Sequence, residues 1–277
     1  LAGGRYAVPS TDFHGASGAD AGPARPAAQP SETGTFAVPN RVVRAVTTAA
    51  RKCVLLLALC FSGLPAFGDE PPGADSAAGN SAPVWGPLEI LDHTVAPGSK
   101  SAFLLTQNQD FDSSFVNSSV WVVRGASAGS SLCLTAGIHG DEINGVEIAR
   151  RVFSSLDPAE VSGTVVMLPM INLAGIRSGE RYMADRRDLN RLFPGRRDGS
   201  LSSIVAASVF KVVTKHCQAL IDLHTGSFSR LNTPQIRVSL DRPGALDMAR
   251  HFGSGVVVLC DGPRGSLRRE ASDAGLD

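Results

Sequence analysis

The sequence lacks the features of a nucleic-acid-binding or disulfide-stabilised protein. Lysine plus arginine and aspartate plus glutamate each number 26, so the formal net charge is zero, and no basic block or stripe occurs. This excludes the electrostatic footprint of a nucleic-acid partner. The five cysteines, at positions 53, 60, 133, 217 and 260, include no CxxC pair. They predict neither a disulfide framework nor a thiolate zinc site, and we expect Cys133 and Cys217 to be buried, unpaired side chains within apolar runs.

The sequence also lacks a transmembrane segment in its N-terminal part, because the apolar run 53–61 is far too short to cross a bilayer. This run follows the basic pair Arg51-Lys52 and precedes small residues that end at Gly68. That layout is typical of a secretory signal peptide. A buried helix is the alternative, but the Pro/Gly-rich stretch 69–87 argues against it. We therefore expect a signal peptide over 41–68 and an exported protein, periplasmic or secreted.

The domain organisation follows from the same composition. Residues 1–40 are rich in Ala, Gly, Pro and Ser and have no periodicity, so they predict a disordered or non-native leader. The first residue is Leu1 and not Met, which fits a fragment or a misplaced start. We expect a linker over 69–84 and the folded domain over 85–277.

Strand-like and helix-like segments alternate through that domain. We expect antiparallel strands within 87–124, buried strands at 131–136 and 164–169, further strands at 219–223 and 255–259, and helices at 141–155, 201–217, 243–252 and 266–275. The alternation predicts an α/β fold, with a mostly parallel mixed sheet covered by helices on both faces. The stretch 171–200 has little periodicity and is long for a passive connection, so we interpret it as a functional loop.

Polar side chains follow two of the expected strands. His139 and Glu142 come after strand 131–136, and His224 comes after strand 219–223. Ligands of open α/β sheets bind at the carboxyl ends of the strands, so these side chains should share one rim. Two imidazoles and a carboxylate are the ligand set of a catalytic zinc, with a fourth position open for water. Since the His-x-x-Glu spacing occurs often by chance, unrelated surface histidines are the alternative. The pattern predicts one Zn²⁺ per chain.

Further polar residues suit roles around such a centre. Asp222 lies two residues before His224, where it would either orient the imidazole or bond to backbone at the strand end. Asn190 and Arg191 are suited to binding a substrate carboxylate, and Arg181 to polarising the carbonyl under attack. The alternative for the arginines is surface ion pairing with nearby acidic residues, namely Asp185, Asp188 and Asp198.

Three segments also carry a family resemblance. His139-Gly-Asp-Glu142, Asp188-Leu-Asn-Arg191 and Asp222-Leu-His224 resemble, in this order, the signature blocks of the succinylglutamate desuccinylase/aspartoacylase family, relatives of the zinc carboxypeptidases. The resemblance covers roughly residues 130–277. It implies a zinc carboxypeptidase-like fold, with a role for each matching residue: zinc ligands His139, Glu142 and His224, substrate-carboxylate ligands Asn190 and Arg191, and the carbonyl-polarising Arg181.

One expected element of that family is missing from the sequence. The family uses a glutamate as general base in a segment reading roughly Thr-x-Glu-x-Gly, and no such segment occurs here. Glu270 lies in a predicted helix that resembles the stretch just before that segment, so we do not expect it to be the base. The resemblance therefore implies a domain that is C-terminally truncated at Asp277 and catalytically weak on its own.

These observations together predict a zinc-dependent hydrolase that cleaves the amide bond of a small, carboxylate-bearing N-acyl amino acid. A metallocarboxypeptidase acting on peptides or cell-wall peptides is the first alternative. A non-catalytic zinc-binding fragment is the second. The pattern predicts neither the acyl group nor an oligomeric state.

Overall fold

The computed structural model describes residues 85–109 and 115–277, so the expected leader, signal peptide and linker lie outside the described residues. The strands are β1 (Leu88–Ile90), β2 (His93–Val95), β3 (Ser99–Gln109), β4 (Phe115–Arg124), β5 (Ser127–Ala136), β6 (Ser162–Leu168), β7 (Ala219–Leu223), β8 (Ile236–Val238) and β9 (Val257–Leu259). The helices are α2 (Asn144–Ser155), α3 (Leu173–Ser178), α4 (Leu201–His216), α5 (Pro243–Phe252) and α6 (Leu267–Asp273), with short 3-10 helices η1 (Pro158–Glu160) and η2 (Leu189–Arg191).

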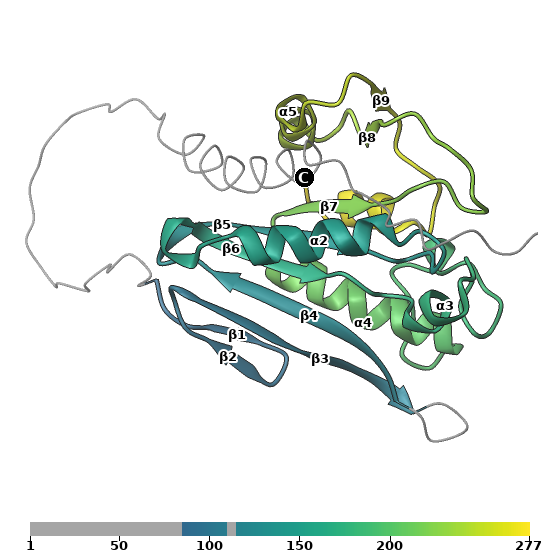
Figure 1. The fold of residues 1–277 in the computed structure, drawn as a ribbon, viewed down its shortest axis with the longest axis horizontal. Helices are drawn as coiled ribbons and strands as arrows, with labels where there is room; N and C mark the ends of the chain where they lie inside the picture. Colours follow the sequence, from purple (N-terminus) through teal and green to yellow (C-terminus); the bar gives the residue numbers. More distant parts are fainter. Residues whose placement is uncertain (1–84, 110–114) are drawn as a thin grey trace, which may run out of the picture. The chain divides into compact units, whose positions relative to one another are not determined.

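The central element is a five-stranded mixed sheet in the order β3-β4-β6-β5-β7 (Figure 1). Strands β3, β4 and β6 pair antiparallel, whereas β5 runs parallel to both β6 and β7. The carboxyl ends of β5 and β7 therefore meet at one edge of the sheet. Two small sheets, β1-β2 and β8-β9, stand apart from it.

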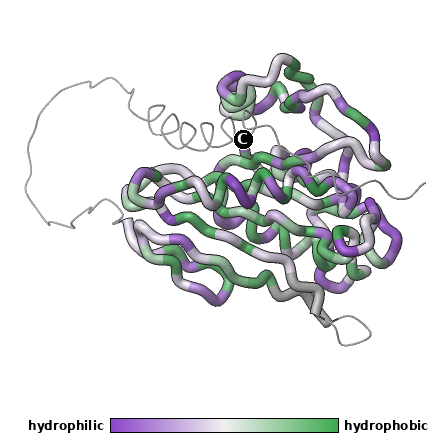
Figure 2. Tube along the Cα trace, in the orientation of Figure 1, coloured by the Kyte–Doolittle hydropathy of each residue, from purple (hydrophilic) through white to green (hydrophobic). Residues whose placement is uncertain are grey.

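Helices cover both faces of this sheet, as predicted. Successive side chains of a strand point to opposite faces. On β6, Val165 and Met167 pack in a cluster with Ile148 and Val152 of α2. The intervening Val166 and Leu168 pack in a second cluster with α4, whose buried residues include Val205, Val209 and Val212. Each such buried side chain contributes about 1.5–3 kcal/mol. Helices α2 and α4 accordingly lie on opposite sides of the sheet (Figure 1), and hydrophobic residues run through its strands (Figure 2).

Some local features differ from expectation. The stretch 171–200 contains α3 and η2, which are too short to show a sequence period. Strand β8 was not predicted, and it pairs with β9 outside the main sheet. None of the helices within residues 85–109 and 115–277 is both long and apolar enough to span a lipid bilayer.

The expectation of two unpaired cysteines in the core is wrong. Cys133 and Cys217 form a disulfide, with their Cα atoms 5.6 Å apart. The two residues are separated by 84 positions in the chain. Because β5 and β7 are neighbours in the sheet, Cys217, which lies two residues before β7, is brought against β5, and no local spacing could have indicated this pairing.

Candidate metal centre

The turn after β5 is fixed by close backbone packing. Gly137 has φ +64°, a conformation that favours glycine. A Cβ on Gly140 would lie 2.1 Å from the carbonyl carbon of Gly175 in α3, so only glycine fits there. The turn consequently holds His139 and Glu142 at the carboxyl end of β5, as the sequence predicted, and both side chains are buried.

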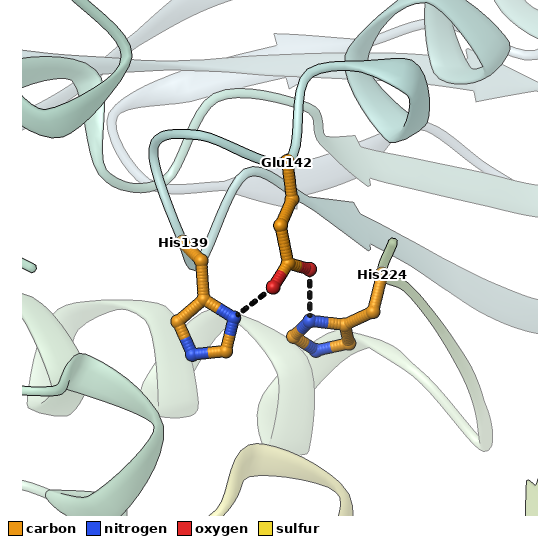
Figure 3. Close-up of side chains that lie close together, drawn as sticks. All are labelled: His139, Glu142 and His224. Carbon is orange, nitrogen blue, oxygen red and sulfur yellow. Dashed lines mark hydrogen bonds and ion pairs between the residues drawn. The ribbon is translucent and has the colours of Figure 1, made fainter. Parts of the chain in front are cut away.

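The predicted metal ligands come together at this edge. Nδ1 of His139 lies 2.8 Å from Oε1 of Glu142, and Nδ1 of His224 lies 2.8 Å from Oε2 of the same carboxylate (Figure 3). One ligand atom from each residue can be chosen so that all lie within 4.8 Å of one another. The two imidazole Nδ1 atoms and the carboxylate thus face a common point.

The outward nitrogen of each imidazole meets a second carboxylate. Nε2 of His139 lies 3.2 Å from Oδ1 of Asp188, and Nε2 of His224 lies 2.8 Å from Oδ2 of Asp222. The other oxygen of Asp222 accepts a hydrogen bond from Thr135, its partner across the β5–β7 ladder, at 2.7 Å. The proposed contact of Asp222 with the imidazole is therefore present. Carboxylates in this position fix the tautomer and ring orientation of histidine ligands.

The donor set fits a zinc ion. Zinc prefers imidazole nitrogen and carboxylate oxygen at sites with an open coordination position. Here the inward atoms of His139, Glu142 and His224 are of those two kinds. The outward ring nitrogens bond to Asp188 and Asp222, whereas the inward Nδ1 atoms face Glu142, where a metal ion would replace their protons.

The site is strongly polarised. Burial alone would raise the pKa of Glu142, but hydrogen bonds from His139, His224 and Ser227 hold it well below its ordinary range. Burial alone would lower the pKa of His224, but the charges and hydrogen bonds of Asp222 and Glu142 outweigh burial and raise it to about 10. For His139 the same competition, with Asp188 and Glu142, also leaves the pKa raised.

Arg181 lies beside the candidate ligands. Its Nη2 donates to Oδ2 of Asp188 at 2.9 Å, and its Nη1 donates to Oγ of Ser227 at 2.6 Å. The backbone at Arg181 is held by Asn172, whose side-chain amide donates to the Arg181 carbonyl at 3.3 Å and accepts from Gly175 of α3. The expected ion pair of an arginine with Asp188 is thus present, but it lies at the centre and not on an unrelated surface.

The two predicted substrate ligands differ in placement. Asn190 is buried, and its Nδ2 lies 3.5 Å from Nε2 of His224. Its Oδ1 accepts from the backbone N–H of Leu267, the first residue of α6, at 2.8 Å. Arg191 is exposed, and its Nη1 donates to the backbone carbonyl of Asn190 at 2.7 Å. Asn190 therefore joins the centre, whereas Arg191 lies at its solvent-exposed margin.

Sequence reasoning missed the loop after β7. Ser227 is 2% exposed and donates to Oε1 of Glu142 at 2.6 Å. The backbone N–H of Phe228 donates to Oδ2 of Asp141 at 2.8 Å. Serine in a loop carries no pattern of its own, so only the position of Ser227 three residues after His224 could have drawn attention to it.

Comparisons with known proteins agree with this geometry. Residues 128–276 match the family model described as the succinylglutamate desuccinylase/aspartoacylase catalytic domain. The N-alpha-acetyl-L-2,4-diaminobutyric acid deacetylase of Halomonas elongata is 35% identical over 99 residues, covering 35% of this chain and 29% of the relative. A succinylglutamate desuccinylase of Burkholderia cenocepacia is 31% identical over 112 residues, covering 36% and 32%.

A solved structure shares the fold. The succinylglutamate desuccinylase/aspartoacylase structure from Rhodobacter sphaeroides superposes with a TM-score of 0.58 at 27% identity, covering 64% of this chain and 55% of that chain. This chain therefore spans about half of that structure, and its matches span about a third of the curated relatives. With the family model matched over more than half of its residues, the chain belongs to the succinylglutamate desuccinylase/aspartoacylase family.

Proposed function

We propose that this chain carries the zinc centre of a hydrolase that removes the acyl group from a small, carboxylate-bearing N-acyl amino acid. The observation that carries the proposal is the convergence of His139, Glu142 and His224, whose candidate ligand atoms lie within 4.8 Å of one another. Family membership supports the same class of reaction, because the relatives named above are a deacetylase and a desuccinylase.

The chain's own residues suggest how the amide would be handled. Zinc in such a site lowers the pKa of a water molecule towards ~7 and polarises a carbonyl group. Arg181, next to Glu142, would donate to the carbonyl oxygen as negative charge develops on it. Asn190 and Arg191 would bind the substrate carboxylate, because an amide and a guanidinium together offer several directed donors.

Three acidic groups that could be considered as a general base are already engaged. Asp188 and Asp222 bond to the histidine rings, and Oε1 of Glu270 accepts from the backbone N–H of Gly265 at 2.8 Å. We therefore assign none of them as the general base, and the sequence contains no Thr-x-Glu-x-Gly segment. Since a general base contributes ~10²–10⁴-fold, we expect slow hydrolysis by this chain alone.

A substrate panel tests the proposal. The zinc-loaded chain should hydrolyse N-acetyl-2,4-diaminobutyrate, N-succinylglutamate or N-acetylaspartate faster than short peptides, and a chelator should remove the activity reversibly. Arg181→Lys keeps the charge but loses the planar donor pair, so it should lower kcat more than it raises KM. Faster cleavage of peptides would favour a carboxypeptidase, and full zinc occupancy without any hydrolysis would favour a non-catalytic zinc-binding domain.

A further inference from the structure

We infer that Ser227 is a positioning residue, which holds the guanidinium of Arg181 in a long, weak contact with the carboxylate of Glu142 and so keeps that carboxylate available to a metal ion. The inference rests on the proposed metal centre. It assigns a role to a loop residue that lies outside the three sequence blocks on which the family resemblance depends.

Backbone hydrogen bonds on both sides of Ser227 fix the loop that carries it. The backbone N–H of Thr225 donates to Oε2 of Glu142 at 2.9 Å, and the backbone N–H of Phe228 donates to Oδ2 of Asp141 at 2.8 Å. Phe228 and Ser229 have φ values of 59° and 57°, which non-glycine residues rarely adopt. Such conformations persist where surrounding contacts fix the backbone. These contacts therefore fix the position of the Ser227 side chain.

The hydroxyl of Ser227 has a defined bonding role. A serine hydroxyl donates one hydrogen bond and accepts up to two. Here it accepts from Nη1 of Arg181 at 2.6 Å. Its single proton can go to Oε1 of Glu142 at 2.6 Å or to Oδ1 of Asp141 at 3.2 Å, and the shorter contact favours Glu142. Ser227 thus bridges the cation to the candidate ligand.

This bridge lengthens the contact between two opposite charges. Nη1 of Arg181 also donates directly to Oε1 of Glu142, but at 3.4 Å, which makes this ion pair longer than the ~2.7–2.9 Å of a strong ionic hydrogen bond. Glu142 is 3% exposed, so a shorter ion pair with Arg181 in this low-dielectric setting would be strong. Such a pair would draw electron density from the carboxylate that the metal needs. It would also turn the guanidinium away from the substrate.

The test is a double-mutant cycle on zinc affinity, measured by competition with a chromophoric chelator and by the absorption spectrum of the cobalt-loaded chain. We expect Ser227→Ala to weaken zinc binding by ~10–100-fold, the usual cost of losing a partner of a metal ligand. In the Arg181→Met background, the same substitution should weaken binding much less, because no guanidinium remains to capture Glu142. Non-additivity of this kind measures direct coupling between two residues.

Controls separate the role of Ser227 from simple packing. Ser239 is also buried and donates to a carboxylate, Asp261 at 2.7 Å, away from the candidate ligands, so Ser239→Ala should leave zinc affinity unchanged. Ser227→Thr keeps the hydroxyl group and adds only a methyl group, so it should retain most of the zinc affinity. Ser227→Gly also lacks the hydroxyl, and it replaces Ser227→Ala if that variant does not fold.

The outcomes distinguish the inference from the proposed function. Wild-type zinc affinity in Ser227→Ala, or an equal loss in both Arg181 backgrounds, would overturn the positioning role while leaving the metal centre intact. Failure of the wild-type chain to bind zinc at all would instead overturn the proposed function, and the inference with it.

Discussion

Nδ1 of His224 lies 2.8 Å from Oε2 of Glu142, although the two residues are 82 positions apart in the chain. The parallel pairing of β5 and β7 produces this contact, because it brings the segments that follow both strands to the same edge of the sheet.

Zinc affinity should rise with pH. A histidine binds metal only when its ring nitrogen is unprotonated, and the pKa of His224 is raised to about 10 from an ordinary 6.5. Between these values, binding must displace its proton, so the affinity should increase about tenfold per pH unit for each proton displaced. The raised pKa of His139 steepens the same trend. Isothermal titration in buffers of different ionisation enthalpy would count the released protons, and a pH-independent affinity would contradict the account.

The stability of the metal-free chain should change in the opposite direction. A raised pKa in the folded state means that the protonated ring of His224 stabilises the fold through Asp222 and Glu142. This contribution is fully present below pH 6.5 and is lost as the pH rises towards 10. Thermal midpoints of the metal-free chain should therefore fall over that range, whereas the midpoint shift produced by zinc should grow.

Asp222→Asn should weaken zinc binding by ~10–100-fold while leaving the fold intact. The carboxylate holds Nε2 of His224 at 2.8 Å, and an amide is a poorer acceptor for that N–H. Asp247→Asn is a matched control, because Asp247 also pairs with a histidine, His251 at 3.6 Å. That pair is exposed on α5 and includes no candidate ligand. Equal zinc affinity in the Asp222→Asn and Asp247→Asn variants would show that Asp222 does not support zinc binding.

The disulfide should stabilise the domain. Replacing both Cys133 and Cys217 by alanine should cost about 2–5 kcal/mol in the free energy of unfolding. The unpaired Cys260 supplies the control, since Cys260→Ser should cost far less. Peptide mapping without reductant should recover the 133–217 cross-link. Thiol labelling of both residues in the non-reduced, denatured protein would show that the bond does not form.

We propose that the protein is exported. The basic pair Arg51-Lys52 before the apolar run 53–61 supports export, and so does a buried disulfide, since disulfides persist mainly in oxidising compartments. Expressed in a bacterium from a start near residue 40, the protein should reach the periplasm with Asp69 close to its mature N-terminus. An uncleaved protein found in the cytoplasm would argue against a signal peptide.

The sequence predicted the residues of this site that directly follow strands. His139, Glu142 and His224 follow buried apolar runs, and the rule that strand ends share an edge was enough to group them. It could not predict Ser227, because a loop with two left-handed non-glycine residues is set by tertiary contacts with Asp141 and Glu142. The prediction of unpaired Cys133 and Cys217 was wrong for a similar reason, because the order of strands in the sheet cannot be read from local sequence spacing.

The most direct test of the central claim is elemental analysis of the purified chain together with its ligand variants. We predict one zinc per wild-type chain, and no tight binding in His139→Ala or His224→Ala, because two remaining ligands cannot hold the ion firmly. Ser239→Ala should retain the full metal content. Undiminished zinc in either histidine variant would contradict the assignment of this centre.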